Sequence, residues 1–210
     1  MPSLSQILRE NSPLLLLDAA SEKIQVGLLG DGAIPKWASR MAEAGVGVFE
    51  CLDELDVEID AVGAFAFCEG PGSILGVRTT AMALRTWNVL RQRPTYAYFG
   101  LAVVAHAIGR PAVFHIADAR RGFWHRMSLG GSPERVPAAE LAGELMTPEG
   151  FRRWDPLPAG ATTASYDLAK LFLIPSVAAA DIFRAAPEPD AFLHQEPAYA
   201  KWTPRIHRAP

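Results

Sequence analysis

The first pattern in this chain that could do chemistry is an aspartate at the end of an apolar run. Leu14–Leu17 is followed directly by Asp18, which places a carboxylate at the carboxyl end of a strand buried on both faces. A carboxylate in that position can hold a metal ion beside a phosphate. The pattern therefore keeps open a small ATP-dependent enzyme with Asp18 at the metal.

A glycine-rich loop is the second pattern, and it lies between a predicted strand and a predicted helix. Backbone N–H groups and the helix dipole could hold an anion there. The loop does not end in the Gly-Lys-Ser/Thr of a Walker loop, and its glycine spacing differs from that of a dinucleotide loop. We interpret it as a tight turn at which two backbones approach closely. Its residues are Gly70, Pro71, Gly72, Ser73 and Gly76.

The third pattern combines arginines with aromatic residues, a chemistry that contacts phosphates and stacks on bases. Its loop residues are Asp118, Arg120, Arg121 and Gly122, and Phe123–Met127 follow as a predicted strand. Alternation along that strand sends Phe123, His125 and Met127 to one face and the other two side chains to the opposite face. Half of the cluster is therefore expected in the core. The basic residues Lys201, Arg205 and Arg208 are a second candidate for contacting nucleic acid.

Hydrolase chemistry has little support in the sequence. No two of the five histidines have the i, i+4 spacing of a zinc peptidase helix, and no Gly-x-Ser-x-Gly elbow is present. Cys51 and Cys68 are predicted to be buried, incidental thiols. We expect neither a peptidase nor a metal site.

Composition narrows the class of protein further. The chain has 210 residues with 20 Lys+Arg against 23 Asp+Glu, a formal charge of −3, and 50% hydrophobic residues. These values are inconsistent with intrinsic disorder and with nucleic-acid binding by net charge alone. The N-terminus shows no export signal, and no apolar stretch is long enough to span a bilayer. A cytoplasmic protein is predicted.

The predicted elements follow a simple order along the chain. Three consecutive strands up to Ser39 precede a helix over 40–55, a strand over 59–68, a long helix from Ser73, a strand over 95–97 and a helix over 100–108. Strands over 112–117 and 122–129 come next, then helical segments over 138–146, 167–172 and 177–183. This order predicts a mixed sheet with helices on its faces. Because 12 of the 17 prolines lie beyond residue 110, the second half is expected to contain more loops.

The long helix from Ser73 has two apolar stripes. Ile74, Val77, Ala81 and Leu84 form one stripe, as expected for a helix that lies on a sheet. A second stripe repeats every seven residues, which is the pattern of helix-on-helix packing. Another helix, from this chain or from a partner, must cover it. The residues of this predicted partner interface are Leu75, Met82 and Val89, with Arg78 and Arg85 between the two stripes.

Taken in chain order, these elements resemble the bacterial TsaB (YeaZ) family, which is often labelled glycoprotease-like or peptidase M22-like. They are Leu14–Asp18 before a strand meander, Gly70–Arg78 opening a helix, and Asp118–Gly122 after a strand. The resemblance covers residues 14–126. Pro197-Ala198-Tyr199 resembles the family's C-terminal Pro-x-Tyr segment, and residues 127–196 show no match.

The resemblance implies an α/β, actin-like ATPase (ASKHA, ribonuclease-H-like) fold, with a mixed sheet, helices on both faces and two subdomains. It implies a non-catalytic scaffold or activator subunit in the synthesis of threonylcarbamoyladenosine in tRNA. The implied partners are a TsaD-type transferase, which carries the metal, and a TsaE-type ATPase. The tRNA would be reached only indirectly. No cofactor is intrinsic, and any ATP or ADP would lie at a partner interface.

The implied organisation is an N-terminal extension over 1–12, a first subdomain with the partner interface over 13–110, and an abbreviated second subdomain over 111–210. Three departures from the family pattern stand out. Ala19-Ala20 replaces a phosphate-contacting hydroxyl after Asp18, Leu75 replaces a threonine, and Trp37–Arg40 does not match the opening of the family's first helix. Two alternatives therefore stay open: a small ATP-dependent enzyme of the same fold and a degenerate paralogue that dimerises with itself.

Overall fold

The structure is a computed structural model that describes residues 1–191, and its larger sheet has six strands. Their order is β11-β5-β4-β1-β2-β3. The central strand β1 pairs antiparallel with β2 and parallel with β4, so that Leu16 lies opposite Gly27 on one side and Ala66 on the other. The bounds are β1 Leu14–Asp18, β2 Ile24–Leu29, β3 Lys36–Arg40, β4 Ala64–Gly70, β5 Thr95–Phe99 and β11 Arg184–Ala185.

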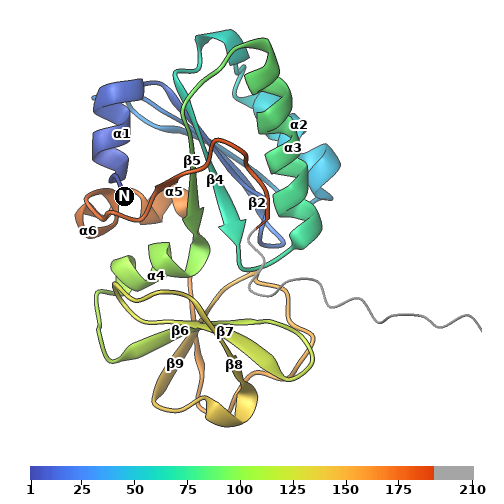
Figure 1. Cartoon of the computed structure of the whole chain (residues 1–210), viewed down its shortest axis with the longest axis vertical. Coiled ribbons are helices and arrows are strands. Elements are labelled where there is room, and N and C mark those ends of the chain that lie inside the picture. The colour runs from blue at the N-terminus through green and yellow to red at the C-terminus, as the bar shows by residue number, and fades with distance from the viewer. Residues whose placement is uncertain (192–210) are drawn as a thin grey trace, which may run out of the picture.

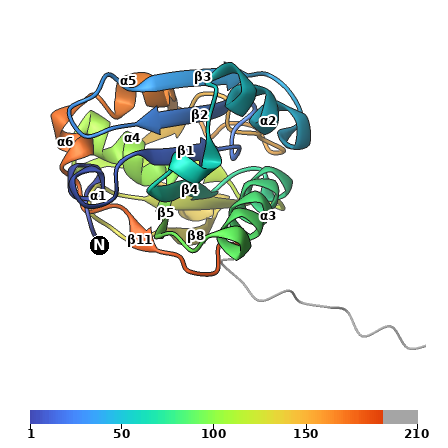
Figure 2. The ribbon, with the colours of Figure 1, turned by 90° about the horizontal axis from the view of Figure 1, so that it is seen from above.

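Helices cover both faces of this sheet, as Figure 2 shows. α2 and α3 lie on one face, and α1, α5 and α6 lie on the other (Figure 1). The leucines of β1 are fully buried because both faces are covered, which explains an apolar run without alternation. The bounds are α1 Leu4–Asn11, α2 Ala44–Glu54, α3 Ile74–Leu90, α5 Leu168–Leu171 and α6 Pro175–Ala178, and a short 3-10 helix spans Ile59–Ala61.

The second sheet has five strands in the order β10-β9-β6-β7-β8. Its central strand β6 pairs antiparallel with β7 and parallel with β9. Helix α4, Gly100–Ile108, contacts both sheets and lies between them (Figure 1). The bounds are β6 Val113–Asp118, β7 Phe123–Met127, β8 Glu134–Pro137, β9 Glu144–Pro148 and β10 Thr162–Ala164, with a 3-10 helix at Ala138–Glu140.

One continuous core joins the two sheets. It runs from the strands of the first sheet through α4 to Ala117 and Met127 of the second. The opposite face of the second sheet has a small core of its own, formed by Ile116, Trp124 and Leu145. The fold class is therefore as predicted: an α/β protein with mixed sheets, helices on both faces of the larger sheet, and two subdomains.

The chain crosses between the sheets twice. After α4 it builds the second sheet, and after β10 it returns, so that α5, α6 and β11 pack on the first. These three elements lie beyond residue 110, where only the second subdomain was expected. Their return has no local signal in the sequence, because β11 has two residues and forms only by pairing with β5. At the other end, α1 is packed on the first sheet through the buried Leu4 and Ile7.

Several predicted elements differ from the structure. The first residues of the strand expected over 59–68 form a 3-10 helix, and β4 begins only at Ala64. The helix expected over 177–183 is the short helix α6, Pro175–Ala178. The helix expected over 138–146 is a 3-10 turn followed by strand β9, because Gly143 has a left-handed φ of 86° and Leu145 pairs with β6. The helix expected from residue 40 begins only at Ala44. Trp37–Arg40 belongs to β3, where the Trp37 ring packs over Gly27 and stacks on Phe172.

Candidate functional site

The outward face of α3 carries the predicted second stripe, and it is open to solvent. Leu75, Met82 and Val89 are 76%, 57% and 85% exposed. Val77, Ala81 and Leu84 are buried on the opposite face, as predicted, but Ile74 is half exposed because it lies at the rim of a cavity. No helix within residues 1–191 covers the second stripe. The alternative in which a described helix of this chain fills that role is therefore wrong.

Arg78 and Arg85 lie beside the stripe and face the same carboxylate. Their guanidinium nitrogens are 3.7 and 3.8 Å from the oxygens of Asp190, which lies near the end of the described chain. Pairs at this distance between exposed side chains contribute little to stability. Both arginines can therefore exchange Asp190 for another acceptor at small cost.

The neighbouring helix α2 extends the apolar surface, which sequence reasoning missed. It packs beside α3, and its Val46 and Phe49 are about half exposed. Met41, just before α2, lines a cavity of about 690 Å³ together with Leu75. The signal was present in the sequence, since Val46 and Phe49 are three residues apart and neither falls on the face that buries Val48 and Cys51.

The loop from Gly70 to Gly76 is a close-packed turn, as predicted. A Cβ atom on Gly72 would lie 2.1 Å from the carbonyl oxygen of Ala20, and one on Gly76 would lie 1.9 Å from that of Ala19. The Ser73 N–H donates to the Ala20 carbonyl at 2.8 Å. The Ser73 side chain caps α3 by accepting from the Gly76 N–H at 3.1 Å. The glycines thus let this loop touch the turn after Asp18.

Asp18 is fully buried and joins three parts of the fold. Its carboxylate accepts from the Tyr98 hydroxyl at 2.9 Å, from the Tyr166 hydroxyl at 2.6 Å and from the Ala20 N–H at 2.9 Å. Burial raises the pKa of this carboxyl above its ordinary value. A metal ion on Asp18, as the ATP-dependent alternative requires, would have to displace the two tyrosine hydroxyls.

The Asp118 loop is built by hydrogen bonds to its backbone. One carboxylate oxygen accepts from the Arg120 N–H at 2.6 Å, and the other accepts from the N–H groups of Trp154 and Asp155, each at 2.7 Å. The Arg120 guanidinium lies 4.0 Å from the centre of the Trp154 ring. In the following strand Trp124 and Met127 are buried, so the prediction that part of the arginine–aromatic cluster belongs to the core is confirmed.

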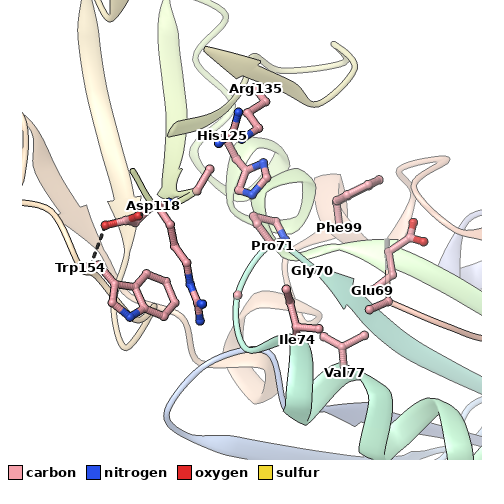
Figure 3. Close-up of a pocket in the computed structure, with 14 residues that line it drawn as sticks. Glu69, Gly70, Pro71, Ile74, Val77, Phe99, Asp118, His125, Arg135 and Trp154 are labelled. Atoms are coloured by element: carbon pink, nitrogen blue, oxygen red, sulfur yellow. Dashed lines mark hydrogen bonds between the residues drawn. The ribbon is translucent and has the colours of Figure 1, made fainter. Parts of the chain in front are cut away.

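Residues of the Gly70 loop and of the Asp118 loop line a common cavity of about 150 Å³ between the subdomains. Figure 3 shows Gly70 and Pro71 of the first loop on one side of it, and Asp118 of the second loop with its neighbour Trp154 on the other. Glu69, at the rim, is buried and forms a bidentate pair with Arg184. Neither Asp18 nor the α3 residues Leu75, Met82 and Val89 line this cavity. The chain therefore has two separate features, an inter-subdomain cavity and an apolar helix face.

Other expected features can be placed as well. Cys51 and Cys68 are free and buried, as predicted. Residues 1–191 contain no group of three or more His, Cys, Asp or Glu side chains that could hold a metal ion, and no helix among them could cross a membrane. The Pro197–Tyr199 segment and the basic residues Lys201, Arg205 and Arg208 lie outside the described residues.

Comparison with known proteins identifies the fold. No protein-family model matches the sequence, and no curated protein matches it. A solved structure described as YeaZ from Pseudomonas aeruginosa matches with a TM-score of 0.57 and 25% identity, covering 77% of this chain and 89% of that one. A second, described as a protein from the same organism with similarity to peptidase YeaZ, matches with a TM-score of 0.55 and 26% identity over 75% and 88% of the two chains. These likenesses confirm the resemblance that the motifs predicted: along most of its length the chain has the fold of the YeaZ (TsaB) family.

Proposed function

We propose that this chain is a non-catalytic scaffold subunit that binds a TsaD-type transferase in the synthesis of threonylcarbamoyladenosine in tRNA. The observation that carries the proposal is the exposed apolar stripe of α3, because three large side chains at a seven-residue repeat are left in water. Burying a Leu, Met or Val side chain contributes about 1.5–3 kcal/mol. A helix packed on Leu75, Met82 and Val89 would therefore be held mainly by these residues.

Arg78 and Arg85 complete the proposed interface. Their weak contacts with Asp190 leave them able to pair with carboxylates of the partner helix, which would fix its register. A TsaE-type ATPase joins the assembly in this proposal, and ATP or ADP would be held at a partner interface. The likeness to YeaZ supports the assignment of family, and the exposed stripe supports the mode of pairing.

A single charge in the centre of the stripe tests the proposal. Met82→Glu should leave the melting temperature unchanged, because Met82 is already exposed, but should weaken the complex with the TsaD-type subunit of the same source at least tenfold. The complex is measured by analytical ultracentrifugation with and without ATP. Leu173→Glu is the matched control, since Leu173 is 67% exposed near α5 on the opposite face of the sheet.

Two results would contradict the proposal. One is a complex of undiminished affinity with the Met82→Glu variant, and the other is failure of the wild-type chain to bind the transferase in any nucleotide state. The same sedimentation runs measure the mass of the chain alone, so a self-dimer that excludes the transferase would favour the degenerate paralogue. Mass spectrometry of tRNA after depletion of the chain should show loss of the modified nucleoside.

A further inference from the structure

A cluster of arginines on the second subdomain has no role in the proposed pairing. Arg120 and Arg121 are exposed in the turn between β6 and β7, and Arg135 projects from β8. Trp154, 43% exposed, lies beside them. We call these four residues the arginine platform. Arg120, Arg135 and Trp154 line the inter-subdomain cavity, so the platform forms one of its walls.

The guanidinium groups of the platform have no ion-pair partner among residues 1–191. No ion pair or side-chain hydrogen bond joins Arg120, Arg121 or Arg135 to a described residue, whereas Arg110 and Arg126 pair with Glu144 and Glu134 at 2.6 and 2.7 Å. The carboxylates of Asp118 and Asp155, which bind the backbone of this turn, do not pair with these arginine side chains. Asp118 binds three backbone N–H groups, and Asp155 accepts from the Gly122 N–H at 2.9 Å. These aspartates shape the loops and leave the guanidinium donors free for an external acceptor.

The guanidinium groups are also held in place by aromatic rings. Arg120 lies over Trp154 at 4.0 Å and Arg135 over Phe123 at 3.8 Å, measured to the ring centres. A stacked guanidinium keeps its N–H edge available for two oxygens of one acceptor, which suits a phosphate. Because the rings fix these side chains in advance, less conformational entropy is lost when a ligand binds.

The backbone of the turn holds its two arginines in a strained conformation. Arg120 and Arg121 have φ angles of 64° and 58°, a left-handed conformation in which glycine or asparagine is less strained. The hydrogen bonds of Asp118 and Asp155 hold this conformation. Strain that the surrounding structure maintains in this way is typical of functional loops.

We propose that the arginine platform binds the phosphate backbone of RNA directly, with Arg120 and Arg135 at one phosphate, Arg121 at the next, and Trp154 stacking on a base. Successive cationic groups beside an exposed indole suit a single RNA strand, because phosphates and bases then find separate partners. This inference goes beyond the pairing proposal and does not depend on it.

The test uses the full chain without any partner, so its outcome is independent of pairing. Fluorescence anisotropy measures binding of a labelled uridine oligonucleotide and of a tRNA transcript between about 50 and 200 mM salt. The variant Arg120→Asn/Arg121→Asn removes two charges and relieves the left-handed strain, so its melting temperature should be maintained or raised. Its affinity for RNA should fall about tenfold, and the slope of log affinity against log salt should decrease by about 1 to 2.

The control variant Arg9→Gln/Lys36→Gln removes two exposed charges from the first subdomain and should bind RNA as the wild type does. Three results would overturn the inference: unchanged affinity and salt slope in the asparagine variant, an equal loss in the control, or no binding by the wild-type chain at the lowest salt. A fourth is displacement of RNA by a phosphoserine peptide of equal charge at equal concentration, which would point to a phosphopeptide ligand instead.

Discussion

Gly76 shows how one missing side chain sets the path of two segments. Any larger residue there would collide with the Ala19 carbonyl, so the glycine loop and the turn after Asp18 could not touch. The sequence predicted a tight turn at this loop because glycine and proline cluster in it. It could not identify Ala19 and Ala20 as the other side of the contact, since they lie more than fifty residues earlier in the chain.

Gly76→Ala should destabilise the fold although alanine is the better helix former. The new Cβ would lie 1.9 Å from a backbone oxygen, and overpacking of this kind costs about 1–3 kcal/mol. Gly45→Ala in α2 is the matched control. A Cβ at that position meets nothing within 4 Å, so the substitution should stabilise by about 0.5–1 kcal/mol. Urea denaturation of both variants measures the difference, and an equal stabilisation in the two would contradict the close contact.

His115 is a second residue whose surroundings make a measurable prediction. It is fully buried on β6, and burial lowers its pKa more than the Met127 backbone raises it. The unfolded chain, with a histidine pKa of about 6.5, then binds more protons than the folded chain in the window below that pH. The free energy of unfolding should therefore fall as the pH drops from about 6.5 through the lowered pKa.

Replacing His115 with leucine should remove this part of the pH dependence. Urea denaturation of wild type and His115→Leu at pH 7.5 and 5.5 measures it, and the loss of stability on acidification should be smaller in the variant. A loss of the same size in both proteins would show that other groups cause the acid sensitivity.

At the scale of elements, the local sequence pattern predicted the long helix α3 well, but it did not predict strands that form only by pairing with distant segments. α3 was predicted to start at Ser73 and to have two faces, because a period of 3.6 is a local signal. β9 and β11 were missed because each exists through pairing with a distant strand. The same limit applies to the candidate site: the loops were found, but the tyrosines that bind Asp18, 80 and 148 residues away, were not.

The strand β11 should depend on the ion pair that Arg184 forms with Glu69. Arg184→Met leaves the buried Glu69 carboxylate without its main partner, and a buried acceptor left unsatisfied costs about 1–3 kcal/mol. Thermal denaturation should show the loss. Glu69→Gln in the same background should recover part of it, because the buried charge is then absent. No recovery would indicate that Arg184 acts by packing alone.

At the scale of the whole molecule, the two subdomains are joined where the chain returns from the second sheet. Gln25 of β2 holds this crossing by donating to the Tyr166 carbonyl at 3.0 Å and accepting from the Leu168 N–H at 2.9 Å. Tyr166 adds its hydroxyl to Asp18 and its ring to Phe151. Asp18, which the sequence indicated as a candidate metal-binding carboxylate, is thus part of the contact between the two subdomains.

Tyr166→Phe should increase local opening at this contact between the subdomains, and Tyr98→Phe should not. Each removes one hydroxyl from Asp18 and should cost about 1–2 kcal/mol, since a buried acceptor loses a donor. Tyr98 lies on β5 within the first sheet, however, so only Tyr166→Phe should speed amide hydrogen exchange over residues 165–168. Equal rates of amide hydrogen exchange in the two variants would show that Tyr166 does not hold the two subdomains together.

The return of the chain to β5 has a consequence for biosynthesis. β5 is complete once residue 99 has been made, but its outer edge stays unpaired until Arg184–Ala185 leaves the ribosome. The first subdomain is thus assembled from segments that precede and follow the second, and its sheet stays incomplete while the second is being made. An open strand edge invites pairing with other chains during that interval. Truncation before residue 184 should therefore yield a product that aggregates rather than a folded first subdomain. The sheet of this subdomain is completed only after the second subdomain has been synthesised.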